Sequence, residues 1–167
     1  VAVIEVDELT LYRQFKNLRP TALVVTNFFR DQLDRAGEME TIIRRIMEVT
    51  KDFEGDLILN ANDPNVLRIG YNAAKANVHY FSVDRNAKSV ETTNEASEGK
   101  FCPVCGKPLK YAYYQYSHIG KFLCPHDGFG NVQSDVEVTS IDYDHGTFQA
   151  HGRQFTSFIN TIYAVYN

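Results

Sequence analysis

Two stretches decide the fold class: VVTNFFRDQLDRAGE (residues 24–38) and LILNANDP (residues 57–64). Each begins with an apolar run typical of a strand and ends in polar residues that lead into a helical pattern. After the first stretch, apolar residues recur at three- and four-residue intervals, at Met39, Ile42, Ile43, Ile46, Val49 and Phe53. After the second, Asp63 is a good N-cap and Pro64 fits the first turn of a helix. Strands that alternate with helices in this way predict βαβ units.

The same alternation extends outward over residues 1–83. VAVIEV (1–6) and VHYFSV (78–83) have the composition of strands, and LTLYRQFKNL (9–18) has the spacing of a helix. We therefore expect an α/β fold with a mostly parallel sheet flanked by helices.

The chain changes character after this segment. Residues 84–100 contain almost no large apolar side chains, and residues 101–130 are rich in cysteine, glycine and tyrosine. Alternating stretches then surround the turn signal Asp144-His145-Gly146, which predicts a hairpin. We predict a main domain interrupted by a small inserted ribbon, with the boundaries 1–97 (first part), 98–131 (ribbon) and 132–167 (return to the main domain, with the hairpin).

The ribbon carries a candidate zinc site. Cys102-x2-Cys105 and Cys124-x2-Asp127 have nearly the C-x2-C-x15-20-C-x2-C spacing of two zinc-binding turns, with Asp127 where a fourth cysteine would stand. His126 is an alternative fourth donor. Two paired turns usually saturate the ion, so the zinc would be structural. The competing interpretation is a ribbon without metal, held by tyrosine packing.

Polar residues follow three apolar runs. Carboxylates of Glu5-Val6-Asp7-Glu8 come after the first run, Asn27 ends the second, and Asn60, Asn62 and Asp63 end the third. The carboxyl ends of parallel strands meet at one edge, where α/β proteins bind ligands, and oxygen ligands there suit magnesium. The competing interpretation of residues 5–8 is a surface acidic turn that caps the next helix.

Composition narrows the classes of partner. Seventeen basic residues against 21 acidic ones give a net charge of -4, which disfavours nucleic acid. No stretch approaches the roughly 20 apolar residues of a membrane span, and no leader opens the sequence, so we expect a cytoplasmic protein. A binding module that uses the ribbon tyrosines remains an alternative; strand alternation would place Tyr111 and Tyr113 on one face, Tyr114 and Tyr116 on the other.

EVDE, VVTNFFRDQLDRAGE and LILNANDP, in this order and spacing, resemble the central domain of the Mur ligase family. The DQLDR form with a CPxC ribbon is similar to the amidating branch of that family. The resemblance implies a P-loop-NTPase-like domain in which ATP phosphorylates a substrate carboxylate, magnesium bridges the phosphates, and an amine displaces phosphate. For the amidating branch it implies the α-carboxyl of D-Glu in lipid II, and ammonia from a GatD-like glutaminase subunit, giving D-isoglutamine.

Motif matching implies roles for individual residues. Glu5 and Glu8 match positions that contact magnesium and phosphate, and Asn27 matches an asparagine near the γ-phosphate. Asn60 and Asp63 match residues near the adenine and ribose; their alternative roles are turn formation and helix capping. Asp31 is a candidate for orienting substrate or ammonia, although it also suits an acidic loop before a helix.

Three departures from the family pattern qualify the resemblance. Gln32 stands where many members have a metal-binding histidine, so we expect one magnesium; residues 34–50 hold no lysine that could be carbamylated. No G-x-x-x-x-G-K-[ST] loop occurs, and both ends look cut from a longer chain, so we expect the chain alone to be inactive. Other superfamily ligases, such as folylpolyglutamate synthetases or amino-acid-adding Mur enzymes, are alternatives that the ribbon and the missing lysine disfavour.

Overall fold

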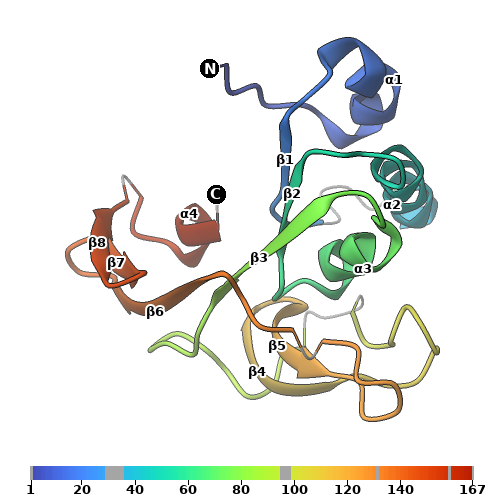
Figure 1. Cartoon of the computed structure of the whole chain (residues 1–167). Coiled ribbons are helices and arrows are strands. Elements are labelled where there is room, and N and C mark those ends of the chain that lie inside the picture. Colours follow the sequence, from blue (N-terminus) through green and yellow to red (C-terminus); the bar gives the residue numbers. More distant parts are fainter. Residues whose placement is uncertain (1, 29–35, 95–98, 131, 158, 167) are drawn as a thin grey trace.

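A six-stranded sheet forms the centre of the computed structural model, which describes residues 2–28, 36–94, 99–130, 132–157 and 159–166 (Figure 1). The first four strands in the sheet are parallel, and the last two extend it in antiparallel fashion. In sheet order they are β1 (Ala22–Val25), β2 (Asp56–Asn60), β3 (Asn77–Val83), β6 (Val136–Asp142), β7 (Thr147–Ala150) and β8 (Arg153–Thr156). The mostly parallel α/β fold is therefore confirmed.

Three helices cover one side of strands β1–β3 in Figure 1: α1 (Glu8–Leu18), α2 (Ala36–Thr50) and α3 (Pro64–Asn72). The main core lies between them and the sheet. Ile43 and Ile46 of α2 are almost fully buried there with Leu57 and Leu59 of β2. The apolar stripe that predicted α2 is thus the stripe that packs on the sheet.

The N-terminal strand prediction is wrong. Residues 2–7 pair with no strand among the described residues, and α1 begins directly at Glu8. Val3 is 96% exposed and Ile4 62% exposed, so this apolar run is not packed. An apolar composition favours a strand only where a neighbouring strand supplies hydrogen bonds, and nothing in the described part of the chain does so here.

The predicted hairpin is confirmed, and a strand that the sequence analysis missed extends it. β6 and β7 pair around the turn at Gly146, which has a φ of 63°. A second tight turn, with His151 at φ 52° and Gly152 at φ 67°, leads into β8. The short helix α4 (Ile162–Tyr166) then packs on the other side of the sheet, where Ile162 and Tyr166 are buried with Val83 and Val138.

The insertion between β3 and β6 contains the two-stranded sheet of β4 (Lys110–Tyr116) and β5 (Ile119–Leu123). Its buried side chains cluster with Leu67 of α3, so the insertion packs against the main domain. After it, the chain returns and β6 pairs with the end of β3. The predicted domain boundaries involve residues 97, 98 and 131, which lie outside the described residues, so these boundaries stay predictions.

The tyrosines of β4 do not alternate as expected. Register shifts between Tyr111 and Tyr113 and between Tyr114 and Tyr116 break the two-residue period. As a result Tyr111 and Tyr114 stack on each other, with ring centroids 4.2 Å apart. None of the four is exposed, and the Tyr113 hydroxyl donates to the carbonyl of Val83 at 3.2 Å. Three of the four tyrosines are half-buried, and the binding module stays an alternative.

Candidate functional site

The ends of β1 and β2 are tied together by two buried side chains. The Asn60 amide donates to the carbonyl of Thr26 at 2.8 Å, and the Asp63 carboxylate accepts the N–H of Phe28 at 2.9 Å. Asp63 also accepts the N–H of Asn65 at 2.8 Å, which confirms it as the N-cap of α3. Asn60 and Asp63 are both 0% exposed. Their predicted contacts with adenine and ribose stay predictions, whereas their turn and capping roles are visible.

Asn27 lies between these two anchor points. Its neighbours Thr26 and Phe28 are the residues that Asn60 and Asp63 hold. The Asn27 side chain is half-buried and has no hydrogen-bonding partner within the described part of the chain. An amide held in place at the carboxyl end of a parallel strand, with free hydrogen-bonding capacity, is suited to contact a ligand.

The acidic residues at the N-terminus lie elsewhere than predicted. Glu5 is exposed on the unpaired segment, and Glu8 is the first residue of α1. The carbonyl of Asp7 accepts the N–H groups of Thr10 and Leu11, each at 3.0 Å, so the acidic turn opens the helix as its alternative interpretation required. The structure does not place Glu5 at the end of a sheet strand, and its magnesium role stays a prediction.

The polar loop before α2 lies outside the described residues. Asp31 falls there, as do Arg30, Gln32, Asp34 and Arg35. Their predicted roles are therefore not addressed by the structure.

The sequence places Asn62 at the sheet edge without giving it a role, and it gives no role to His118. Asn62 is 1% exposed, and its side-chain oxygen accepts the N–H of Val83 at 2.7 Å and the hydroxyl of Tyr166 at 2.9 Å. His118, which lies in the β4–β5 turn, is 1% exposed, with Nε2 3.4 Å from Oδ1 of Asp63. Asn62 could be placed at the sheet edge from sequence, but nothing local in the sequence connects His118 to Asp63.

The two cysteine turns of the ribbon are built alike. Gly106 donates its N–H to the carbonyl of Cys102 at 2.9 Å, and Gly128 donates to Cys124 at 3.0 Å. In each turn the N–H of the first cysteine also donates, at 2.7 Å, to the carbonyl five positions on. Both glycines have positive φ, 70° and 77°, which only glycine adopts without cost. The turns thus present their side chains to one common point.

The four predicted ligands meet at that point. The sulfurs of Cys102, Cys105 and Cys124 and a carboxylate oxygen of Asp127 all lie within 4.8 Å of one another. The Cys105 and Cys124 sulfurs are 3.6 Å apart, and Asp127 Oδ2 is 3.3 Å from the Cys102 sulfur. Zinc–sulfur and zinc–oxygen bonds of about 2.3 and 2.0 Å give tetrahedral edges of about 3.8 and 3.5 Å, so the cluster fits zinc. His126 is exposed and is not a member of the cluster.

Burial and neighbouring groups shift the pKa values of these ligands. Burial raises the pKa of Cys102. The backbone N–H of Lys107 lowers the pKa of Cys105, but desolvation, Asp127 and the neighbouring thiols outweigh it and raise that pKa to about 12. The N–H of Phe129, followed by the neighbouring thiols, holds the pKa of Asp127 well below its usual range. Since zinc binds thiolates, its binding here would release protons.

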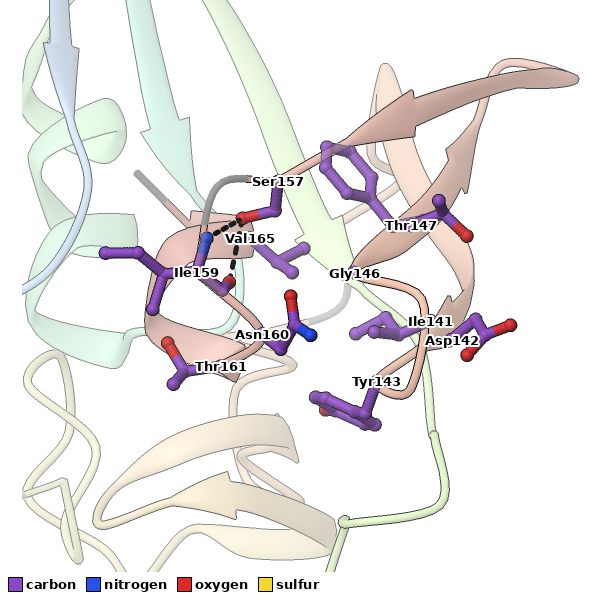
Figure 2. A pocket seen from close by; sticks show the side chains of 11 residues that line it. Ile141, Asp142, Tyr143, Gly146, Thr147, Ser157, Ile159, Asn160, Thr161 and Val165 are labelled. Carbon is purple, nitrogen blue, oxygen red and sulfur yellow. Dashed lines mark hydrogen bonds between the residues drawn. The ribbon is translucent and has the colours of Figure 1, made fainter.

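A cavity lies apart from the strand ends and from the cysteine turns, between the β6–β7 turn and the segment before α4 (Figure 2). The Ser157 hydroxyl donates to the carbonyl of Ile159 at 2.9 Å and closes one side (Figure 2). Its volume of about 10 Å³ holds about one water molecule. A cavity of this volume is too small for a nucleotide, and none of the described residues that line it is a predicted site residue.

Comparison with known families decides the fold family. The model of the Mur ligase middle domain matches residues 1–124. The chain belongs to the Mur ligase family. Among curated Mur ligase relatives, it is 37% identical over 142 residues to the lipid II isoglutaminyl synthase (glutamine-hydrolyzing) subunit MurT of Staphylococcus aureus strain COL, covering 85% of this chain and 32% of that subunit. It is 29% identical over 172 residues to the subunit of the same name from Streptococcus pneumoniae strain ATCC BAA-255 / R6, covering 100% and 38%.

A solved ligase structure shares the fold. The pseudomurein peptide ligase type C from Methanothermus fervidus superposes with a TM-score of 0.69 at 24% identity, covering 93% of this chain and 30% of that one. The chain thus spans about a third of the length of these relatives. Among its described residues, no helix is both long and apolar enough to cross a bilayer.

Proposed function

We propose that this chain supplies the middle part of an ATP-dependent peptidoglycan ligase of the lipid II isoglutaminyl synthase type. The 37% identity to the S. aureus subunit, over 85% of this chain, carries the proposal. The strand-end geometry supports it, because Asn60 and Asp63 hold Asn27 at the sheet edge where α/β proteins bind ligands.

The proposed reaction has two steps. The α-carboxylate of D-Glu in lipid II attacks the γ-phosphorus of ATP, which gives an acyl phosphate and releases ADP. Ammonia then attacks the acyl carbon, inorganic phosphate leaves, and the product is D-isoglutamine. The partner that supplies ammonia is a GatD-like glutaminase subunit, and the substrate is met at the inner face of the membrane.

Within this reaction we assign Asn27 the contact with the γ-phosphate, Asn60 and Asp63 the adenine and ribose side, and Asp31 the orientation of substrate or ammonia. Glu5 and Glu8 are the candidate ligands of one magnesium ion, which would neutralise phosphate charge when bound. For Glu5 and Glu8 to reach the ends of the other strands, residues 2–7 have to pair beside β1, whose Val24 is 55% exposed.

The ribbon is proposed to hold one structural zinc ion through Cys102, Cys105, Cys124 and Asp127. The ion would saturate its four ligands and supply folding energy to a module too small for a large core. We assign it no step in the reaction.

A chimera tests the proposed function. The matching 142 residues of the S. aureus subunit are replaced by those of this chain, and lipid II is incubated with the chimera, MgATP and ammonium chloride. We expect the D-Glu carboxyl to become an amide, detected by mass spectrometry of the muropeptide, with ADP formed in equal amount. Asn27→Ala in the chimera is expected to reduce the rate by about 10² or more. Asn17→Ala, on the exposed face of α1, is the matched control and should leave it unchanged.

The outcomes separate the alternatives. A folded chimera that makes no amide, while the parent subunit does, would refute the proposal. Addition of an amino acid in place of ammonia would assign the chain to the amino-acid-adding ligases. The chain of 167 residues by itself, which contains no phosphate-binding G-x-x-x-x-G-K-[ST] loop, is expected to form no ADP under the same conditions.

A further inference from the structure

The turn of the ribbon hairpin reaches the loop between β2 and α3. At residue 62 the two segments pair in both directions: Gly120 donates its N–H to the carbonyl of Asn62 at 2.9 Å, and the Asn62 amide donates to the carbonyl of Gly120 at 3.2 Å. A Cβ at Gly120 would collide with the backbone of Tyr113. The pairing of β5 with β4 beside this contact therefore needs glycine at position 120.

His118 extends this contact to Asp63. Its Nε2 lies 3.4 Å from Asp63 Oδ1, with side-chain exposures of 2% and 0%. The same carboxylate accepts the N–H groups of Phe28 and Asn65. One buried group thus joins the end of β1, the start of α3 and the ribbon. A buried carboxylate is stable only when its oxygens have polar partners, so His118 influences the position of the Asp63 carboxylate.

The surroundings of His118 fix its position. The Tyr111 hydroxyl donates to the carbonyl of Gly99 at 2.8 Å and lies 3.1 Å from the carbonyl of His118. A Cβ at Gly99 would meet His118 Cβ at 2.8 Å and Pro64 Cγ at 3.1 Å. The beginning of the ribbon, its hairpin turn and the first turn of α3 therefore leave one another little freedom.

The zinc ligands and the hairpin turn belong to one small body. Cys102 and Cys124 are buried with Phe122 and Phe129 in the cluster that also includes Leu67 of α3. A two-stranded sheet is marginally stable by itself, so this body depends on its ligand cluster and on its docking. Zinc that binds the ordered form stabilises both the turns and the docked hairpin by mass action.

We infer that the hairpin turn of the ribbon is a working part of the strand-end site: His118 is a positioning residue for Asp63, and metal binding at the cysteine turns is coupled to the order of residues 60–63. This inference rests on the proposed function only for the identity of the ligand that residues 60–63 bind. Coupling of this kind is reciprocal, so a ligand that orders the loop would also raise the affinity of the ribbon for zinc.

Amide hydrogen exchange of the zinc-loaded chain tests the positioning role. The amides of Phe28 and Asn65 report on Asp63, because both donate to its carboxylate. His118→Leu is expected to speed their exchange by about tenfold or more, and His118→Gln, which keeps an N–H donor, to restore part of the protection. The amides of the cysteine turns and the zinc content should not change.

The chain offers a matched control. His79 of β3 lies 3.5 Å from Asp56 of β2. This pair is on the surface, near the starts of the two strands, and so at the opposite end of these strands from Asp63. His79→Gln should therefore leave the Phe28 and Asn65 amides unchanged. Unaltered exchange at these two amides in zinc-loaded His118→Leu would overturn the positioning role.

Removal of zinc with a chelator tests the coupling. We expect faster exchange at Phe28 and Asn65 in the wild type, a smaller further effect in His118→Leu, and continued protection of Ile43 and Ile46 in α2. Unchanged protection at Phe28 and Asn65 would overturn the coupling. So would loss of protection in α2, since the metal would then support the whole chain. If hydrogen exchange at Phe28 and Asn65 responds as expected but the chimera forms no D-isoglutamine, this inference stands and the proposed function is rejected.

Discussion

Replacing Asn62 by alanine is expected to destabilise this chain far more than an ordinary asparagine substitution. The Asn62 side chain accepts from the N–H of Val83 and the hydroxyl of Tyr166 and donates to the carbonyl of Gly120. Val83 is 1% exposed and Tyr166 3% exposed, so water does not readily replace the lost partner. The substitution therefore strands buried polar groups from β3, α4 and the ribbon at once.

The magnitude follows from these groups. A buried donor that loses its partner costs about 1–3 kcal/mol, so the two stranded donors cost about 2–6 kcal/mol. Tyr166 lies in a short terminal helix and can adjust, which favours the lower half of that range, about 3 kcal/mol. Domains of this size are typically stable by about 5–15 kcal/mol, so the variant should fold but with a much lower urea midpoint.

Urea unfolding of zinc-loaded protein, followed by circular dichroism, measures the effect. Asn77→Ala is the control, because its exposed amide bonds only to the surface side chains of Asp56 and His79, and it should change stability by about 0.5 kcal/mol or less. Asn62→Ala should cost less in a Tyr166→Phe background, which lacks one of the stranded donors. A cost under about 1 kcal/mol, or full additivity with Tyr166→Phe, would refute the reasoning.

Three further results are expected. In chelator competition, Asp127→Ala should lower zinc affinity by about tenfold or more and His126→Ala should leave it unchanged; the reverse ranking would move the fourth ligand. Gly128→Ala forces a side chain to a φ of 77° and should cost about 1–2 kcal/mol in urea unfolding, and an unchanged midpoint would mean a different turn. The hydrogen bond from His145 lowers the pKa of Asp142 from 3.8. The stabilising effect of this hydrogen bond is therefore present above pH 3.8 and is lost as the pH falls through the lowered pKa. His145→Ala should move the pKa of Asp142, followed by NMR, back toward 3.8, and no movement would contradict this cause.

The elements that could be predicted from sequence are those whose causes are local. The apolar stripe of α2, the Asp63 cap and the β6–β7 turn each depend on residues a few positions apart. The cysteine turns are local as well, and their pairing needs only a short hairpin between them.

The structural predictions failed where the conformation of a segment depends on a neighbouring segment. VAVIEV has the composition of a strand, yet residues 2–7 have no strand beside them within the described part of the chain. The β4 tyrosines follow two bulges that no composition reveals. The Asn62–Gly120 and Asp63–His118 contacts join segments more than 50 positions apart, and such contacts leave no periodic signal in one sequence.

The contacts also rank the candidate residues at the strand ends. An ionised carboxylate offers about four lone-pair directions; Asp63 uses two for the N–H groups of Phe28 and Asn65, and its Oδ1 lies 3.4 Å from Nε2 of His118. With 0% exposure, Asp63 has little capacity left for a nucleotide, and its main effect is to hold the loop. Asn27 is half-buried and has an unused amide in the described structure. We therefore expect direct contact with a ligand to fall first to Asn27, and we expect the ribbon to act on that contact through Asp63, which holds the neighbouring residue Phe28.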